Sequence, residues 1–350
     1  MQTYKTQDNL KNIFLHLQDE TSKWLFEKRM MYSLTGDESF INQIIKSLLQ
    51  KYNVDSLMEK VGEVKERLIV YGAGNDFLLL SRLYPVLNGA CLCDRDQEKQ
   101  KTGWIGHHVI SPEQLLKDYQ DYYVLISTTM FQDEIEDFLI KNGWDKSKIL
   151  NPKIVASEWY SQQYFDEEIM KPCPNEIFID GGCYDCSTDR LFIKWCGGDY
   201  KKIYAFEPDI KNYEKCLKEA DRIPNLELAN KGLWSREETL HFAGGAEQGS
   251  RIIETKDQSV TTISVAAIDD VVGEDKVTFI KMDVEGAELE ALKGARKTIM
   301  KHHPRLAISI YHKPEDIWEI PAYILSLSKD YRLYIRHYQL SKNETILYAV

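Results

Sequence analysis

The sequence has no long apolar run and no apolar segment at its amino terminus. Nowhere does it contain the roughly 18 consecutive apolar residues that a membrane-spanning helix needs. The first residues, from Met1 to Lys11, are polar and lack the apolar region of a signal peptide. We therefore expect no membrane insertion and a cytoplasmic location.

The sequence also lacks an excess of positive charge. It has 44 basic and 55 acidic residues, which gives a net charge of −11 at neutral pH. Nucleic-acid backbones and anionic membrane surfaces are bound by clusters of lysine and arginine. We therefore expect no nucleic-acid partner, and we favour a small molecule or a carbohydrate as the substrate.

Cysteine spacing argues against a disulfide framework or a metal site. The seven cysteines form only two close pairs, Cys91-x-Cys93 and Cys183-x-x-Cys186. An odd number of cysteines within predicted strands and helices is typical of reduced thiols. A zinc site would need a second pair, or histidines at ligand spacing. We therefore predict buried thiols and no metal ligands among the cysteines.

The length of 350 residues exceeds what one ordinary core accommodates. We predict three regions, which are a helical extension over residues 1–66, a small α/β domain over residues 67–152, and a larger α/β domain with its linker over residues 153–350. Apolar residues three and four apart in the extension, such as Ile13 and Leu17, indicate helices that pack on a neighbouring domain or on a second subunit. A homodimer is therefore one possibility, and the fold class is α/β.

The smaller domain begins with an apolar strand, Leu68–Tyr71, and a glycine turn at residues 72–74. Asp94 ends the next predicted strand, over residues 86–93, where a dinucleotide-binding domain holds a ribose. However, Phe77 replaces the third glycine of the dinucleotide fingerprint, which weakens this interpretation. A nucleotide site, an oxidoreductase centre and a domain kept for assembly all remain open.

This domain resembles the small Rossmann-like domain that accompanies several bacterial sugar-modifying enzymes. The resemblance rests on Tyr-Gly-Ala-Gly at residues 71–74, Cys-Asp-Arg-Asp at residues 93–96, and Val-Ile-Ser-Pro-Glu at residues 109–113. It implies a site for a nucleotide or a nucleotide-sugar.

The stretch from Glu176 to Asp189 organises the larger domain. An apolar strand is followed by Asp180, Gly181 and Gly182 and then by an amphipathic segment, which is the pattern of strand, tight turn and helix. In an open α/β sheet, the ligand crevice opens at such a turn. An acid before the glycines would repel a pyrophosphate. It suits a cationic ligand with hydroxyl groups, such as S-adenosylmethionine.

Further acids end the strands that follow. Glu207 ends the strand over residues 202–206, and its carboxylate can accept two hydrogen bonds from ribose hydroxyls. Pro208 then stops that strand because it has no amide hydrogen. Asn230 and Lys231 end the third strand, where an adenine edge would lie.

Asp283 ends the fourth strand, over residues 277–282, and Glu285 follows two positions later. Residues two apart in an extended segment point the same way, so Lys281, Asp283 and Glu285 could share the crevice side. His312 lies at the end of the fifth strand, over residues 304–310. We predict that the carboxylates of Asp180, Glu207 and Asp283 converge around one cationic nucleoside.

Six segments follow one another in the order found in the FkbM family of S-adenosylmethionine-dependent methyltransferases, which this part of the chain resembles. They are Ile-Asp-Gly-Gly (179–182), Phe-Glu-Pro-Asp (206–209), Ser-Val-Ala-Ala-Ile-Asp-Asp (264–270), Ile-Lys-Met-Asp-Val-Glu-Gly-Ala-Glu (280–288), Leu-Lys-Gly-Ala (292–295) and Pro-Arg-Leu-Ala-Ile-Ser (304–309). The resemblance covers about half the chain, from Phe165 to Val350. It implies a class I methyltransferase fold and methylation of a hydroxyl on a sugar or natural product. One departure is Gly-Gly-Cys at residues 181–183, where the family usually has Gly-Ala-Asn.

The resemblance also implies a role for each predicted site residue. Asp180, Gly181 and Gly182 would bind the methionine end of the cofactor, Glu207 and Pro208 the ribose side, and Asn230 and Lys231 the adenine side. Asp283 would lie beside the transferred methyl group. We predict that His312, or else Glu285, takes the acceptor proton, because an imidazole with a near-neutral pKa suits that role. Asp283 and Glu285 could instead hold a divalent metal.

Two other functions remain open. One is a non-catalytic ligand-binding or scaffolding protein that keeps the methyltransferase fold, and the other is the nucleotide-dependent oxidoreductase of the smaller domain. Unpaired acids at strand ends have no packing use, which argues against the first. We also predict a hairpin arm over residues 233–242 and a glycine loop over residues 244–251 that could close over a substrate.

Overall fold

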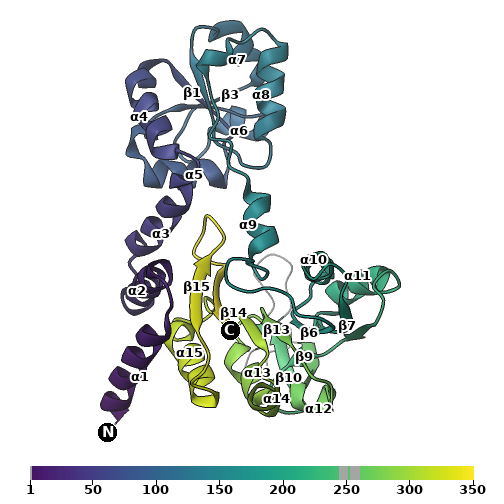
Figure 1. Cartoon of the computed structure of the whole chain (residues 1–350). Coiled ribbons are helices and arrows are strands. Elements are labelled where there is room, and N and C mark those ends of the chain that lie inside the picture. Colours follow the sequence, from purple (N-terminus) through teal and green to yellow (C-terminus); the bar gives the residue numbers. More distant parts are fainter. Residues whose placement is uncertain (1, 244–250, 253–260) are drawn as a thin grey trace. The chain divides into compact units, whose positions relative to one another are not determined.

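The computed structural model describes residues 2–243, 251–252 and 261–350, and the chain forms two compact units (Figure 1). One unit comprises residues 42–159, and the other combines residues 1–41 with residues 160–350. Most of the predicted glycine loop, residues 244–250, lies outside the described residues.

These boundaries differ from those predicted at residues 66 and 152. The amino-terminal helices contribute to both cores, since Ile13 and Leu17 are buried in the larger unit, and Ile45 and Leu49 in the smaller one.

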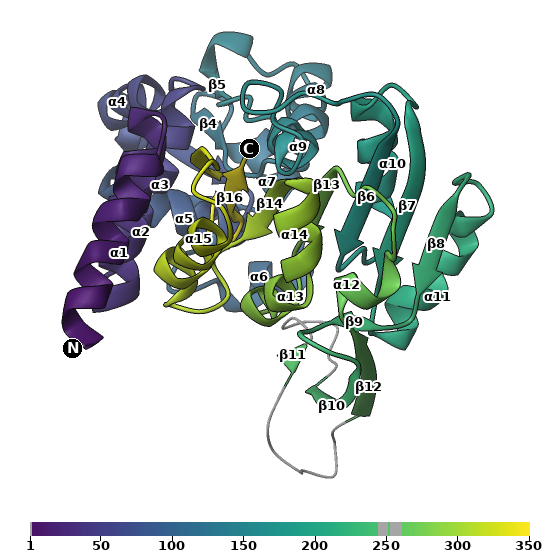
Figure 2. The ribbon, with the colours of Figure 1, turned by 60° about the horizontal axis from the view of Figure 1, so that its bottom comes forward.

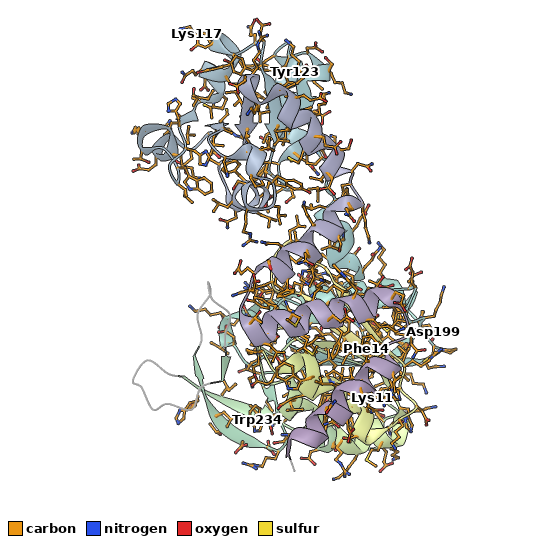
Figure 3. The ribbon with its side chains drawn as sticks, turned by 90° about the vertical axis from the view of Figure 1, so that its left-hand side faces the viewer. Lys11, Phe14, Lys117, Tyr123, Asp199 and Trp234 are labelled. Atoms are coloured by element: carbon orange, nitrogen blue, oxygen red, sulfur yellow. The ribbon has the colours of Figure 1, made fainter. Side chains whose placement is uncertain are left out.

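Four helices form the amino-terminal region, as the apolar spacing predicts. They are α1 (Gln2–His16), α2 (Glu20–Thr35), α3 (Ser39–Gln50) and α4 (Val54–Val64). The Asp19 side chain caps α2 by accepting a hydrogen bond from the Ser22 amide, and Gly36 ends this helix in a left-handed conformation. Lys11 and Phe14 lie on α1 (Figure 3).

The smaller unit contains a five-stranded parallel sheet in the order β3-β2-β1-β4-β5. Its strands are β1 (Leu68–Tyr71), β2 (Cys91–Cys93), β3 (Val109–Ile110), β4 (Tyr123–Ile126) and β5 (Ile149–Leu150). The helices after η1 (Lys65–Arg67) are α5 (Asn75–Leu83), η2 (Pro85–Leu87), α6 (Gln97–Thr102), α7 (Pro112–Asp118), α8 (Gln132–Lys141) and η3 (Lys146–Lys148). Strand β2 is shorter than predicted because residues 85–87 form a 3₁₀ turn. Helix α9 (Ala156–Gln162) spans the boundary between the units.

The larger unit contains a seven-stranded sheet in the order β15-β16-β14-β13-β6-β7-β8 (Figure 2), in which β16 runs antiparallel to both neighbours. Its strands are β6 (Glu176–Gly181), β7 (Tyr200–Phe206), β8 (Leu226–Ala229), β13 (Phe279–Met282), β14 (Arg305–Ser309), β15 (Leu333–His337) and β16 (Thr345–Ala349). Its helices beyond α1 and α2 are α10 (Ser187–Trp195), α11 (Ile210–Ala220), α12 (Ile268–Val271), α13 (Glu288–Gly294), α14 (Arg296–His302) and α15 (Asp316–Leu327). The last two strands have no counterpart in the sequence prediction.

A second, smaller sheet in this unit has the order β11-β10-β12-β9. Its strands are β9 (Gly232–Leu233), β10 (Glu238–Ala243), β11 (Arg251–Ile252) and β12 (Thr261–Ala266). The predicted arm is present, and β10 pairs antiparallel with β12. Trp234, which follows β9, packs against Ile263 and Val265 (Figure 3).

The order of the strands places the topological switch point of the sheet, where an open α/β sheet is expected to bind a ligand, between β6 and β13. From β6 the chain continues outward through β7 and β8, whereas β13 and β14 lie on the other side of β6. At such a reversal the loops after the two strands diverge, which opens a crevice at their carboxyl ends.

The core beneath this switch point is aromatic. Phe178 and Phe192 stack with their ring centroids 4.3 Å apart, and Phe165 from the linker packs on Phe279 at 5.8 Å. Within the described part of the chain, no helix combines the length and apolarity that crossing a bilayer requires.

Candidate active site

The glycine turn after β6 is held tightly between β7 and β13. Gly182 has a φ of +79°, and a Cβ atom on it would lie 2.0 Å from the backbone oxygen of Asp283. The amides of Gly182 and Cys183 both donate to the Phe206 carbonyl, at 2.9 and 3.1 Å. Only glycine can therefore occupy position 182 without moving the backbone.

Asp180 forms a buried ion pair. Its side chain is fully buried, and its Oδ1 lies 2.8 Å from Nζ of Lys281, which is itself buried. The same ammonium donates to the carbonyls of Gly181 and Gly182 at 3.1 and 2.8 Å. Burial raises the pKa of Asp180, and the Lys281 charge opposes that rise. The pair therefore holds the turn in place. Oδ2 of Asp180 has no hydrogen-bond partner among the described residues, and its direct contact with a ligand stays a prediction.

Glu207 is buried at the end of β7 and is 6% exposed. Its Oε2 accepts the Tyr184 amide at 3.0 Å, and its Oε1 accepts the Asp209 amide at 2.9 Å. Among the described residues, no cation pairs with this carboxylate, and burial raises the pKa of Glu207 to about 7. Each oxygen retains a free lone pair for a further donor.

The other residues predicted near the nucleoside have structural partners. The Asn230 side-chain amide donates to the Glu207 carbonyl at 2.8 Å and to the Pro208 carbonyl at 3.2 Å. Lys231 pairs with Glu237 at 2.7 Å. Asn230 thus supports the backbone that carries Glu207, and Lys231 is engaged by the loop that follows.

Asp283 is held by two tyrosine hydroxyls. Tyr164 donates to its Oδ2 at 2.8 Å, and Tyr311 donates to its Oδ1 at 3.1 Å. Burial by itself would raise the pKa of Asp283, but the charges of His312 and Lys281 lower it. Asp283 is therefore an ionised and fixed group.

His312 lies among three carboxylates. Its Nδ1 is 2.9 Å from Oε1 of Glu288, and its Nε2 is 3.4 Å both from Oδ1 of Asp283 and from Oε2 of Glu285. Burial opposes protonation, but these acids, Glu288 foremost, raise the pKa of His312 to about 10. A pKa of about 10 makes the imidazole a cation at neutral pH, which argues against the role of base that the sequence predicted for His312.

Glu285 is the most accessible acid of this group. Its side chain is 46% exposed, and its backbone has a φ of 54°, which is uncommon for a residue with a side chain. Burial raises the pKa of its carboxyl. Such strain in a non-glycine residue is typical of functional sites, where the fold holds a side chain in place.

Three residues of the site escaped the sequence analysis. Glu288, which is fully buried, also accepts the Val284 amide at 2.9 Å. Glu344 accepts the Tyr311 hydroxyl at 3.3 Å, and burial raises its pKa to about 7. Tyr164 lies in an aromatic cluster of the sequence, with Trp159, Tyr160 and Phe165, ahead of the glycine turn, and this cluster is the one signal that could have indicated it.

The acid and histidine group offers ligand atoms to a metal, although not the expected pair. One atom each from Asp283, Glu288 and His312 lies within 4.8 Å of the others. The prediction named Asp283 and Glu285. The structure therefore brings together a different set of possible ligand atoms from the one that the sequence predicted.

In the smaller unit, Asp94 serves the backbone of the glycine turn. Its Oδ2 accepts the Ala73 amide at 2.8 Å, and its Oδ1 accepts the Asp96 amide at 2.9 Å. Phe77 is fully buried and packs edge-on against His107 at 5.0 Å. The oxidoreductase alternative needs Asp94 free to bind a ribose and a glycine at position 77. In the structure Asp94 binds backbone amides, and position 77 holds a buried phenylalanine.

Comparison with known proteins finds a family model that matches part of the chain. Residues 184–339 match the family model of the methyltransferase FkbM domain. No curated protein matches the chain.

Among solved structures, the chain is similar to methyltransferase FkbM from Methylobacillus flagellatus KT, with 20% identity and a TM-score of 0.52 over 90% of this chain and 100% of that one. This likeness shows a shared fold. SMU.1697c from Streptococcus mutans, solved with S-adenosylhomocysteine, is 14% identical, with a TM-score of 0.34 over 56% of this chain and 99% of that one. Fibrillarin from Aeropyrum pernix, solved with S-adenosylmethionine, is 11% identical, with a TM-score of 0.36 over 55% and 76%.

Proposed function

We propose that this chain, whose residues 184–339 match the methyltransferase FkbM domain, transfers a methyl group from S-adenosylmethionine to a hydroxyl group of a sugar or a related small metabolite. The observation that carries the proposal is the juxtaposition of the Gly182 turn with the group formed by Asp283, Glu285 and His312. A backbone that only glycine permits faces the carbonyl of Asp283, and the carboxylate of that residue faces the imidazole.

Glu207 supports binding of the nucleoside. Its carboxylate is buried without a cation and accepts one backbone amide at each oxygen. Two ribose hydroxyls can donate to the lone pairs that remain, and hydrogen bonds to a charged group contribute about 1.5–3 kcal/mol each. The residues therefore fit a ribose at this position.

Asp180 and Lys281 have a positioning role in this proposal. Lys281 holds the carbonyls of Gly181 and Gly182, and Asp180 neutralises the buried ammonium. The pair keeps the turn close to β13, and neither side chain needs to touch the ligand.

S-adenosylmethionine, when bound, supplies a methyl group on a sulfonium, which an oxygen nucleophile can attack in line. The chain must then align the acceptor hydroxyl and remove its proton. We assign proton removal to Glu285, whose side chain is 46% exposed and can therefore reach an acceptor. Its partial burial raises the pKa of the carboxyl, which makes the carboxylate a stronger base. The cationic His312, 3.4 Å from Glu285, orients that carboxylate.

The acceptor class follows from the donors and acceptors near Glu285. Asp283, Glu285 and Glu344 offer carboxylate oxygens, and Tyr164 and Tyr311 offer hydroxyls. Carboxylates accept hydrogen bonds from several hydroxyls at once and repel anions. A neutral polyhydroxylated acceptor is therefore favoured over a phosphorylated one.

Calorimetric titration with S-adenosylmethionine, and separately with NAD, tests the proposal. We expect binding of S-adenosylmethionine in the micromolar range and no binding of NAD. Incubation with neutral sugars should release S-adenosylhomocysteine with at least one acceptor, and turnover confined to nucleotide-sugars would contradict the preference for a neutral acceptor. Binding of NAD without S-adenosylmethionine would contradict the proposal, and binding of S-adenosylmethionine without turnover on any hydroxyl acceptor would favour the non-catalytic alternative.

A further inference from the structure

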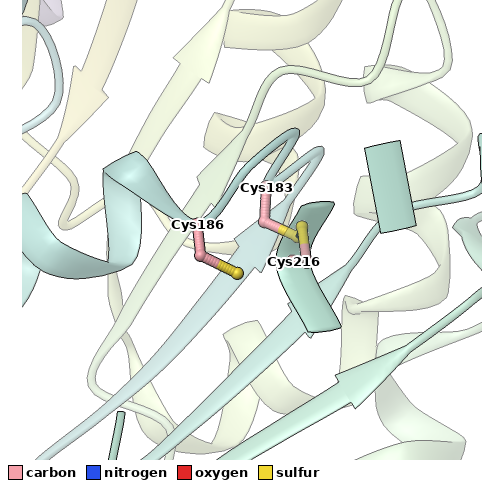
Figure 4. A group of neighbouring side chains, drawn as sticks. All are labelled: Cys183, Cys186 and Cys216. Atoms are coloured by element: carbon pink, nitrogen blue, oxygen red, sulfur yellow. The ribbon is translucent and has the colours of Figure 1, made fainter. Parts of the chain in front are cut away.

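Three cysteines, two from the loop after the glycine turn and one from a helix, lie close together (Figure 4). Cys183 follows Gly182, Cys186 immediately precedes α10, and Cys216 lies on α11. All three are fully buried, and their Sγ atoms lie within 4.8 Å of one another. The spacing of Cys183 and Cys186 did not reveal the third thiol, which comes from 33 residues away in the chain.

The separation of the sulfurs suits a tetrahedral metal ion. Zinc binds thiolate sulfur at about 2.3 Å, so two sulfurs on one zinc lie about 3.8 Å apart. The Sγ atoms of Cys183 and Cys216 are 3.6 Å apart. The Cys186 amide donates to the Cys183 carbonyl at 2.9 Å, and this turn brings both cysteines to the same side.

The turn adopts a conformation that costs energy. Tyr184 and Cys186 have φ angles of 55° and 59°, in the left-handed region that residues with side chains seldom occupy. A fold keeps such angles where the surroundings enforce them, often around a ligand.

Asp189, on the first turn of α10, lies near the three thiols, although its carboxyl oxygens are not among the ligand atoms that lie within 4.8 Å of one another. Its side chain is fully buried, and neither of its oxygens has a hydrogen-bond partner. It lies close enough to Cys183 and Cys186 to interact with both electrostatically. A buried carboxyl without partners is costly, and a cation beside it would remove that cost. This orphaned group is the observation, independent of the cysteines, that points to a ligand.

We propose that Cys183, Cys186 and Cys216 bind a zinc ion in a structural site, with the carboxyl group of Asp189 as the nearest group for the fourth position. Binding would release the thiol protons to solvent and leave three thiolate ligands on the metal. The site is distinct from the group around His312 and does not depend on the methyltransferase proposal.

The site would fix the cofactor loop to α11. Tyr184 lies between two of the ligands, and its amide donates to Glu207. A metal here would therefore hold the residue proposed to bind the ribose, although it would take no part in methyl transfer.

Native mass spectrometry and elemental analysis of the full chain test the proposal. We expect about one zinc per chain after purification without chelator, and removal by chelation under mild denaturation should lower the melting temperature by several degrees. Cys216→Ser and Asp189→Asn should both lose most of the zinc. Cys196→Ala is the matched control, since Cys196 is buried in the same unit but does not belong to the group, and it should keep the metal.

If the variants do not fold, cobalt substitution in the wild-type protein still tests whether the three thiols bind a metal. Cobalt bound by three thiolates gives intense sulfur-to-metal charge-transfer absorption, which we expect at stoichiometric metal. Failure of the folded wild-type chain to bind either zinc or cobalt would overturn the proposal. So would formation of a Cys183–Cys216 disulfide on peroxide treatment in a chain that binds no metal, which would identify a redox pair instead.

Discussion

The ammonium of Lys281 lies 2.8 Å from Oδ1 of Asp180, and both side chains are buried. The acid of the glycine turn is therefore neutralised within the protein, by a residue of the neighbouring strand. Asp180 would therefore support a cofactor site indirectly, by neutralising the lysine that holds the glycine turn in place. Loss of binding in an Asp180 variant would then reflect a displaced turn, and this changes how such a variant is interpreted.

We expect Lys281→Met to destabilise the protein by about 3–5 kcal/mol, because Asp180 would remain buried without its partner. Urea denaturation measures this change. Lys301→Met is the matched control, since Lys301 pairs with Glu274 at 2.7 Å with both side chains exposed, and its loss should cost less than about 1 kcal/mol. Equal effects of the two variants would contradict the assignment.

Gly182→Ala should abolish binding of S-adenosylmethionine or reduce it at least about a hundredfold, because the added Cβ would lie 2.0 Å from the Asp283 oxygen. Gly198→Ala provides a control with nearly the same backbone, since its φ is +80° and no atom lies within 4 Å of the added Cβ. We expect the control to lose about 1 kcal/mol of stability and to keep its affinity. Calorimetric titration of both folded variants with S-adenosylmethionine measures the two affinities. Equal affinities would contradict a role for the Gly182 turn in binding.

Glu207→Gln should weaken S-adenosylmethionine binding about tenfold to a hundredfold, as expected for the loss of charged hydrogen bonds. The exposed Glu227→Gln on β8 should leave it unchanged. Because the pKa of Glu207 is about 7, we also expect wild-type affinity to fall as the pH decreases below that value, by up to about tenfold per unit. Affinity that is independent of pH in the wild type would argue against a role for this carboxylate.

NMR titration of His312 should show an imidazole that stays protonated at neutral pH and titrates near pH 10. His302, whose pKa is lowered by burial and by Lys301, serves as the reference within the same spectrum. The folded pKa of His312 exceeds the unfolded value of about 6.5, so its stabilising contribution is complete below that pH and is lost as the pH rises through about 10. A midpoint between pH 6 and 7 would restore His312 as a candidate base.

Glu285→Gln should lower kcat by about a hundredfold to ten-thousandfold, in the range that removal of a general base produces, and should leave the affinity for S-adenosylmethionine nearly unchanged. Glu290→Gln, a partly exposed acid on α13 that pairs with Lys293, should keep wild-type turnover. If Glu285→Gln retains kcat within threefold, proton removal belongs to another group or to solvent.

The sequence indicated the positions of the acids in the larger unit because each follows an apolar strand. An apolar strand can be recognised from neighbouring residues alone, and so can the polar residue that ends it. Asp180, Glu207 and Asp283 were therefore placed correctly at strand ends. The motif order also indicated the likeness to the FkbM family, which the match over residues 184–339 confirms.

Contacts between distant segments could not be predicted in the same way. Tyr164 and Asp283 are 119 residues apart, and Cys183 and Cys216 are 33 residues apart. The charge state of His312 depends on three carboxylates that meet only when β13, α13 and the end of β14 come together. The sequence could not predict the raised pKa of His312, since a pKa is set by surroundings rather than by residue type.

The sequence by itself determined the α/β architecture of this protein, the likeness of residues 184–339 to the FkbM methyltransferase domain and the strand ends that carry its acids, because periodicity and local motifs encode them. Only the tertiary structure decided which acids are neutralised, which one is accessible and which thiols meet, because burial and electrostatic interaction depend on the three-dimensional proximity of residues far apart in the chain.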